Sequence, residues 1–70
     1  MAKTDWYARR NELMPGDVFS SCFGVVVRLN RCVPGDGSRW YADTMAWDGQ
    51  WTADDFTVEP GDLIEKLAAA

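Results

Sequence analysis

The residues of this chain that could carry out chemistry are two cysteines and a few pairs of acidic residues. Cys22 and Cys32 could supply a nucleophile or metal-binding thiolates, but the 70-residue sequence contains no histidine. Without an imidazole, a cysteine nucleophile lacks its usual activating base, and two thiols alone are too few for a structural zinc site. We therefore expect no catalytic residue, no metal and no cofactor from the cysteines.

The pairs of acidic residues do not indicate a catalytic or metal-binding site either. Asp54 and Asp55 are adjacent, and Asp43 and Asp48 lie five residues apart. A calcium loop needs alternating oxygen ligands and a glycine at a fixed offset, which the segment DGQWTADD does not provide. Acidic residues on exposed turns more often keep a small protein solvated. The sequence thus favours a protein that is not an enzyme.

The tripeptide Pro-Gly-Asp occurs three times, at residues 15–17, 34–36 and 60–62. A phosphate-binding loop would need further glycines, a following lysine and a strand-to-helix context. Proline instead presets φ for a turn, glycine accepts positive φ, and aspartate bonds back to the chain. The unequal spacings of 19 and 26 residues exclude an internal repeat. These tripeptides therefore predict turns, and Asp48-Gly49 predicts another at a hairpin.

Apolar residues alternate with other residues between the turns, which is typical of half-buried strands. Between the cysteines, one face would carry Phe23, Val25, Val27 and Leu29. A straight strand would hold the cysteines about 33 Å apart, and a disulfide needs Cα atoms within about 7 Å, so we expect two free thiols. The expected strands are 17–20, 22–32, 39–47, one beginning at residue 50, and 63–65.

Two segments break this pattern. The N-terminal TDWYARRNELM is expected to form one or two helical turns or an irregular segment, with Asp5 as the N-cap. In that arrangement one side would carry Trp6, Tyr7, Leu13 and Met14. The stretch TADDF interrupts the alternation between Trp51 and Phe56, which predicts a single helical turn or a bulge.

Composition predicts one small folded domain with a thin core. Hydrophobic residues make up 47% of the chain, too many for a disordered segment. No apolar run reaches the roughly 20 residues of a membrane helix, and the N-terminus lacks the apolar stretch of a secretion signal, so we expect a cytoplasmic protein without membrane contact. The ending KLAAA looks like read-through of an expression-vector cloning site, so we expect the domain to span 1–65 and residues 66–70 to be vector-derived.

Charge is divided unevenly along the chain. Residues 1–39 hold six basic and four acidic residues, a net +2, whereas residues 40–70 hold one basic and seven acidic residues, a net −6. Such an acidic half either solvates the protein or attracts a basic partner.

Five short strands joined by hairpins point to a small antiparallel barrel. The layout resembles the SH3-like barrels of bacterial and mobile-element proteins over about residues 13–65, through PGDVF, CFGVVVRLN, VPGDGS, AWDGQW and TVEPGDLIE. The resemblance implies a mainly β fold, a five-stranded antiparallel SH3-like barrel after a short N-terminal helical or irregular segment. Type II dihydrofolate reductases, which are similar barrels, carry Val-Gln-Ile-Tyr where this chain has FTVEPG, so their activity is not implied.

The segment RWYADTMAWD places large aromatic groups on both faces of one strand. Trp40 and Ala42 share a face with Thr44, whereas Tyr41 shares the opposite face with Asp43, Met45 and Trp47. Only one face can fill a thin barrel. The other is either covered by the N-terminal segment or presented to a partner.

Three functional classes are compatible with these sequence features. We favour a non-enzymatic protein-binding module, such as a phage or mobile-element accessory protein, that binds another protein or itself as a homodimer or larger oligomer. Its partner-binding residues would be Tyr41, Asp43, Met45, Trp47, Asp48 and Trp51. The alternative is a nucleic-acid-binding barrel that combines aromatic stacking with Arg28, Arg31 and Arg39. The net charge of −4 works against that alternative. A small-ligand pocket, such as a methyl-lysine cage of Trp40, Tyr41 and Trp47, is disfavoured because these side chains do not share one strand face.

Overall fold

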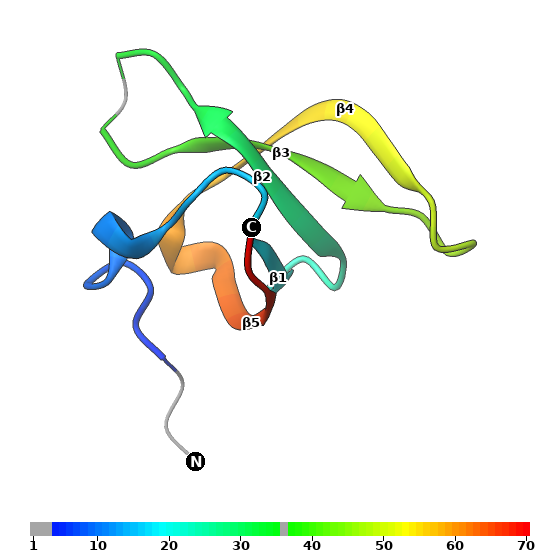
Figure 1. Ribbon diagram of the computed structural model, residues 1–70, viewed down its shortest axis with the longest axis horizontal. Helices are drawn as coiled ribbons and strands as arrows, with labels where there is room; N and C mark the ends of the chain where they lie inside the picture. The colour runs from blue at the N-terminus through cyan, green and yellow to red at the C-terminus, as the bar shows by residue number, and fades with distance from the viewer. Residues whose placement is uncertain (1–3, 36) are drawn as a thin grey trace.

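The fold is a five-stranded antiparallel sheet with strand order β4-β3-β2-β1-β5 (Figure 1). The computed structural model describes residues 4–35 and 37–70, and it describes residues 53–55 by their backbone alone. The strands are β1 (Val18–Ser21), β2 (Val26–Cys32), β3 (Trp40–Met45), β4 (Trp51–Val58) and β5 (Leu63–Ala68). The predicted mainly β, antiparallel architecture is confirmed.

The sheet is curved but not closed into the predicted barrel. Among the described residues, β4 pairs only with β3 and β5 pairs only with β1, so both remain edge strands. The N-terminal segment helps to cover the core beside β5, because the Trp6 indole Nε1 donates a hydrogen bond to the Ile64 carbonyl oxygen at 3.1 Å.

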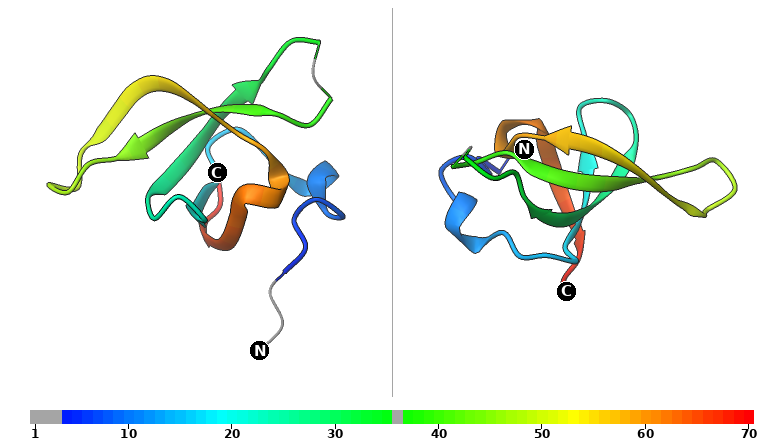
Figure 2. Two further views of the ribbon diagram at one scale, coloured as in Figure 1. Left: turned by 180° about the vertical axis from the view of Figure 1, so that it is seen from behind. Right: turned by 90° about the horizontal axis from the view of Figure 1, so that it is seen from above.

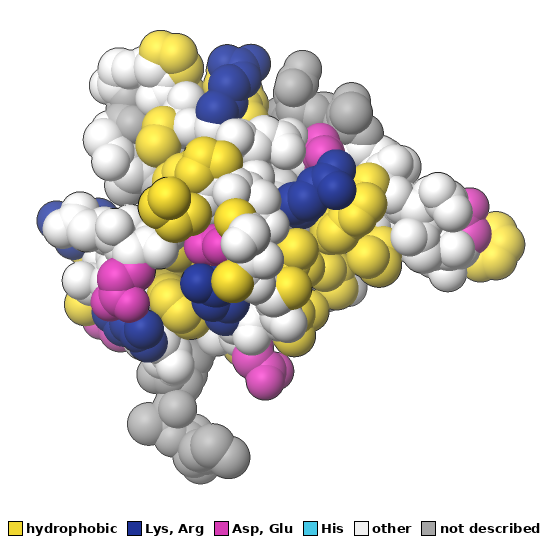
Figure 3. Space-filling view, in the orientation of Figure 1, with side chains coloured by type: hydrophobic (Ala, Val, Ile, Leu, Met, Phe, Trp, Pro, Cys, Tyr) yellow, Lys and Arg dark blue, Asp and Glu magenta, His cyan; other side chains and the backbone are white. Residues whose placement is uncertain are grey.

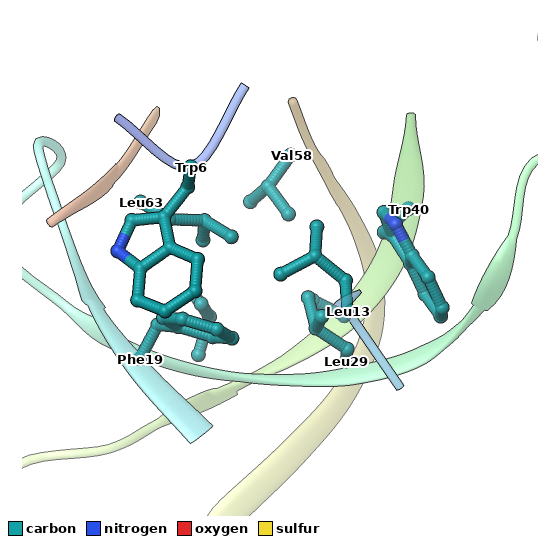
Figure 4. Close-up of a cluster of buried hydrophobic side chains, with 9 residues drawn as sticks. Trp6, Leu13, Phe19, Leu29, Trp40, Val58 and Leu63 are labelled. Carbon is teal, nitrogen blue, oxygen red and sulfur yellow. The ribbon is translucent and has the colours of Figure 1, made fainter. Parts of the chain in front are cut away.

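One hydrophobic cluster lies on the inner face of the sheet, as Figure 4 shows. Phe19 and Trp6 meet edge to face, with ring centroids 4.9 Å apart. The predicted alternation in β2 is confirmed for Val27 and Leu29, which are both buried. The full cluster is Trp6, Leu13, Phe19, Val27, Leu29, Trp40, Ala42, Val58 and Leu63.

The N-terminal segment is a series of turns that ends in a single 3-10 turn, η1 (Arg10–Glu12). Asp5 accepts a hydrogen bond from the Ala8 backbone N–H at 3.1 Å, as its predicted capping role requires. The prediction that four apolar residues share one side is wrong in part. Trp6 and Leu13 are buried, but Tyr7 and Met14 are exposed, because the segment does not keep the period of an α-helix.

The second strand is shorter than predicted, since β2 begins at Val26 and not at residue 22. Gly24 has φ of 80°, and its N–H donates to the Ser21 carbonyl oxygen at 3.2 Å, so the chain turns there. Cys22 therefore lies in the β1–β2 turn and Cys32 at the end of β2, and both are exposed free thiols.

The third and fourth strands form a long hairpin that extends away from the rest of the molecule (Figures 1 and 2). Its register shifts between Ala42, which pairs with Phe56, and Thr44, which pairs with Thr52. Three residues of β4 thus stand opposite one residue of β3, which confirms the predicted bulge.

The Pro-Gly-Asp tripeptides lie at turns where they are described. Gly16 has φ of 95° just before β1, and residues 60–62 form the 3-10 turn η2 (Pro60–Asp62) between β4 and β5. The middle copy includes Asp36, which lies outside the described residues. The last strand continues past the predicted 63–65 to Ala68, so residues 66–68 pair with β1. The origin of residues 66–70 stays a prediction.

Candidate protein-binding site

The two faces of β3 have different surroundings, as its alternation predicts. Trp40 and Ala42 belong to the buried cluster on the inner face. Tyr41 and Met45 are half-buried on the opposite face of the strand. The predicted partner-binding residues are therefore separated from the core residues, but they do not form one uniform surface.

Asp43 is buried, and its carboxylate forms hydrogen bonds with side chains of the neighbouring strand β2. Its carboxylate accepts a hydrogen bond from Arg28 Nη2 at 2.7 Å and another from Asn30 Nδ2 at 2.8 Å. The bond from Arg28, and then that from Asn30, holds the pKa of Asp43 below its ordinary value. Both side chains come from β2, so this carboxylate ties β2 to β3 and has its hydrogen-bonding capacity largely occupied.

The two half-buried aromatic residues of this face each lie under an arginine. The guanidinium carbon of Arg31 is 4.4 Å from the ring centroid of Tyr41, and that of Arg28 is 4.6 Å from the Trp51 ring. These are cation–π distances. A partner would therefore meet an arginine-covered aromatic surface here. Met45 pairs with Trp51 across the hairpin, further toward its tip.

The hairpin tip presents Trp47, whose exposed fraction is 99%. The Gly49 N–H donates to the Ala46 carbonyl oxygen at 2.9 Å, and the Ala46 N–H donates to the Gln50 carbonyl oxygen at 2.8 Å. Gly49 has φ of 84°, as in a three-residue hairpin loop that closes with a glycine. Asp48 Oδ1 also accepts from the Gln50 N–H at 3.0 Å, so its carboxylate helps to fix the turn.

The structure thus spreads the six predicted residues along the hairpin. Tyr41 and Asp43 lie toward its base, Met45 and Trp51 form its last ladder pair, and Trp47 and Asp48 occupy its tip. Figure 3 shows hydrophobic surface next to acidic surface at the outer end of the hairpin. The acidic residues Asp54 and Asp55 lie outside the described side chains.

One aromatic pair was not identified from the sequence, and only its member Phe23 is exposed, since Phe56 is half-buried and packs against the core cluster. Phe23 and Phe56 meet edge to face with ring centroids 5.3 Å apart, and Phe23 is largely exposed. Alternation alone assigned Phe23 to the core face. The turn at Gly24 moves it out of the strand, and the glycine was the available signal for that bend.

The three arginines of the nucleic-acid alternative do not form an open basic surface. Arg28 pairs with Asp43, and Arg39 Nη2 lies 3.4 Å from Glu59 Oε1. Arg31 lies over Tyr41. Two of the three positive charges are therefore matched by carboxylates of the same chain.

Comparisons of this chain with protein-family models, curated protein sequences and solved structures give no match. Within residues 4–35 and 37–70, no helix is long and apolar enough to cross a membrane.

Proposed function

We propose that this protein is a non-enzymatic protein-binding module whose main contact element is the tip of the β3–β4 hairpin. The observation that carries the proposal is the complete exposure of Trp47 on a turn fixed by backbone hydrogen bonds. Tryptophan is among the residues that contribute most to protein interfaces, and its burial by a partner removes a large apolar area from water.

The backbone hydrogen bonds across the turn support this role. A partner that binds a flexible loop loses affinity to the ordering of that loop, whereas the hydrogen bonds around Gly49 already hold the tip in place. The Asp48 carboxylate accepts a hydrogen bond from the turn and carries a negative charge next to Trp47. A partner that receives Trp47 in an apolar pocket should therefore have a neutral or basic surface beside that pocket. Met45 and Trp51 extend the contact surface along the hairpin.

We also propose that the chain follows the path of an SH3-like fold. The pairing of the last strand with the first, and a 3-10 turn directly before the last strand, support an SH3-like chain path with an open side. The phage or mobile-element origin rests on the resemblance alone. The open side between the edge strands β4 and β5 distinguishes this fold from a closed barrel, and the long β3–β4 hairpin carries the contact residues.

Light scattering on a sizing column, over a wide concentration range, tests whether the partner is a second copy. If it is, the mass of the unmodified chain rises with concentration and the Trp47→Ala variant stays monomeric. Tyr7→Ala is the matched control, because Tyr7 is an exposed aromatic residue away from the hairpin. Equal association of all three chains would contradict a role for the tip in self-association, and a monomeric unmodified chain would direct the search to another protein.

The second candidate function, nucleic-acid binding, is favoured by one observation. Arg28 and Arg31 lie over aromatic rings on the outer face, and such pairs occur where bases stack. A titration with single-stranded DNA at two salt concentrations tests it. Binding that weakens at the higher salt supports the candidate, and absence of binding at the lower salt removes it.

A further inference from the structure

The first Pro-Gly-Asp tripeptide contains a buried carboxylate, that of Asp17, which is not part of the proposed site at the hairpin tip. Asp17 is 1% exposed. Its Oδ2 accepts a hydrogen bond from the Met14 N–H at 3.0 Å, within its own turn. Its Oδ1 accepts from the Ala70 N–H at 3.0 Å, and its Oδ2 lies 3.4 Å from Lys66 Nζ. This carboxylate therefore binds both a main-chain group and a lysine of the C-terminal segment.

Strand β1 and Gly16 complete the contact with the C-terminal segment. Val18 pairs with Ala68, and Phe19 pairs with Lys66, so residues 66–68 lie along the edge of β1. Figure 1 shows the C-terminus beside this strand. A side chain at Gly16 would bring its Cβ within 3.0 Å of the Ala70 Cβ. The absence of a side chain at this position is thus part of the contact.

The turn is held in place without the C-terminal segment. The Gly16 N–H donates to the Leu29 carbonyl oxygen at 2.7 Å, and the Leu29 N–H donates to the Asp17 carbonyl oxygen at 2.9 Å. Both bonds connect the turn to β2. The side of the contact that carries Asp17 is buried, whereas residues 66–70 are all exposed. The arrangement is that of a fixed receptor surface and a segment lying on it.

The third Pro-Gly-Asp tripeptide makes a similar contact within its turn, but its contact with another segment is weaker. Asp62 Oδ2 accepts from the Glu59 N–H at 2.9 Å, and the Glu59 and Asp62 side chains cap η2 reciprocally. Its carboxylate thus caps its own turn, and its Oδ1 accepts only a long contact of 3.7 Å from the weak donor Cys22 Sγ in the β1–β2 turn. Asp17 also bonds within its turn, but it additionally accepts a backbone hydrogen bond from Ala70 and pairs with Lys66.

We propose that Asp17, Gly16 and the edge of β1 form a docking site for an extended, lysine-containing peptide segment of another protein. The partner segment replaces residues 66–70 and adds a strand beside β1. Its lysine pairs with the Asp17 carboxylate, and small side chains two and four positions after the lysine lie against Val18 and Gly16, as Ala68 and Ala70 do in the resident segment. The resident segment Lys66-Leu67-Ala68-Ala69-Ala70 has this pattern, and the charge complementarity of the site selects the lysine.

The proposal is tested by NMR on the full-length, isotope-labelled Lys66→Ala variant. This substitution weakens the binding of residues 66–70 to the site. In the unmodified chain these residues compete with an added peptide at a high effective concentration, because they are part of the same chain. The probe is the synthetic peptide Lys-Leu-Ala-Ala-Ala with an amidated C-terminus, and the matched control is Ala-Leu-Ala-Ala-Ala. We expect saturable shifts of the backbone amides of residues 16–19, with affinity for the control peptide at least about fivefold weaker, which corresponds to an ion pair of about 1 kcal/mol.

A second substitution identifies the receptor group. Adding Asp17→Asn to the Lys66→Ala variant should abolish the preference for the lysine peptide, whereas adding Trp47→Ala should leave it unchanged. Absence of shifts at residues 16–19, or equal shifts with both peptides, would overturn the proposal. If Lys66→Ala loses the dispersed spectrum of a folded protein, the same two peptides are titrated into the unmodified chain, where the same criteria apply at higher peptide concentration.

Discussion

The base and the tip of the β3–β4 hairpin each carry a tryptophan, and the two have opposite environments. Trp40, at the base, is 7% exposed and belongs to the core cluster, whereas Trp47, seven residues later, is 99% exposed. Trp40 stands opposite Val58, which is also buried. Trp47 lies beyond the last ladder pair, Met45 and Trp51. The environment of each tryptophan is therefore set by its distance from the core along one hairpin.

This difference indicates how a small protein can separate stability from recognition. The inner-face cluster holds the sheet together, and a residue at the hairpin tip can be exchanged without disturbing that cluster. Apolar burial stabilises the base, while backbone hydrogen bonds and a glycine of positive φ shape the tip. If this division is correct, substitutions at the base should affect the free energy of unfolding, and those at the tip should affect association.

The strongest test of the comparison is the substitution of each tryptophan by alanine. Trp40→Ala should lower the free energy of unfolding by about 3–5 kcal/mol, since it removes a large buried side chain and leaves a cavity. Trp47→Ala should change it by less than about 0.5 kcal/mol, as for other exposed positions. Urea denaturation followed by circular dichroism measures both. Similar destabilisation by the two substitutions would show that the tip packs against the core.

A smaller effect is expected at Asp43, between the base and the tip. Asp43→Ala should destabilise the protein by about 2 kcal/mol, because it removes two hydrogen bonds and leaves Arg28 and Asn30 without their shared acceptor. The matched control is Asp48→Ala, which removes an exposed carboxylate from the same hairpin. Urea denaturation of both variants at neutral pH measures their free energies of unfolding. An equal loss of stability in the two variants would contradict the structural role of Asp43.

The effect of Asp43 should also depend on pH. Its pKa is lowered in the folded protein, so it binds its proton less readily there than in the unfolded chain. The associated stabilisation is complete above the unfolded pKa of about 3.9 and is lost as the pH falls through the lower, folded pKa. The stability difference between the unmodified chain and Asp43→Asn should therefore shrink below about pH 4. A difference that stays constant down to pH 2 would show that the carboxylate charge is not what stabilises the sheet.

The smallest of these effects is expected in the turn itself. Gly49→Ala places a side chain at φ of 84° and should cost about 1 kcal/mol. Gly61→Ala is the control, because Gly61 lies in a turn without positive φ and with open space around it. We expect Gly49→Ala also to weaken any association that depends on Trp47, and thermal denaturation combined with light scattering measures both effects.

Much of the architecture was predictable from local patterns in the sequence. Alternation placed Val27 and Leu29 inside, and the break in alternation after Trp51 located the bulge. Proline and glycine located the turns. The start of β2 was misplaced because the alternation runs without interruption through Gly24, although the glycine itself, which has a positive φ, was a signal of the bend. The closed barrel was wrong because local patterns do not show which edge strands will meet.

The candidate site was less predictable than the fold. Alternation along the strand correctly separated Tyr41 and Trp47 from the core face, but it could not show that Asp43 would be bound by Arg28 and Asn30 from the neighbouring strand. That contact depends on the register of β2 against β3, which places Arg28 opposite Asp43. The role of Asp17 depends in the same way on pairing between β1 and β5, about 50 residues apart in the chain.

Site-specific photo-crosslinking at the hairpin tip is the most direct way to find out whether the tip binds a partner. A benzophenone amino acid is placed at position 47 in one chain and at position 7, another exposed aromatic position, in a second chain. Both are irradiated in an extract of the cells that naturally express the protein. We expect a discrete adduct from position 47, either with a second copy or with another protein, and none of that mass from position 7. Absence of an adduct at position 47, or the same adducts from both positions, would contradict the hairpin tip as the binding element.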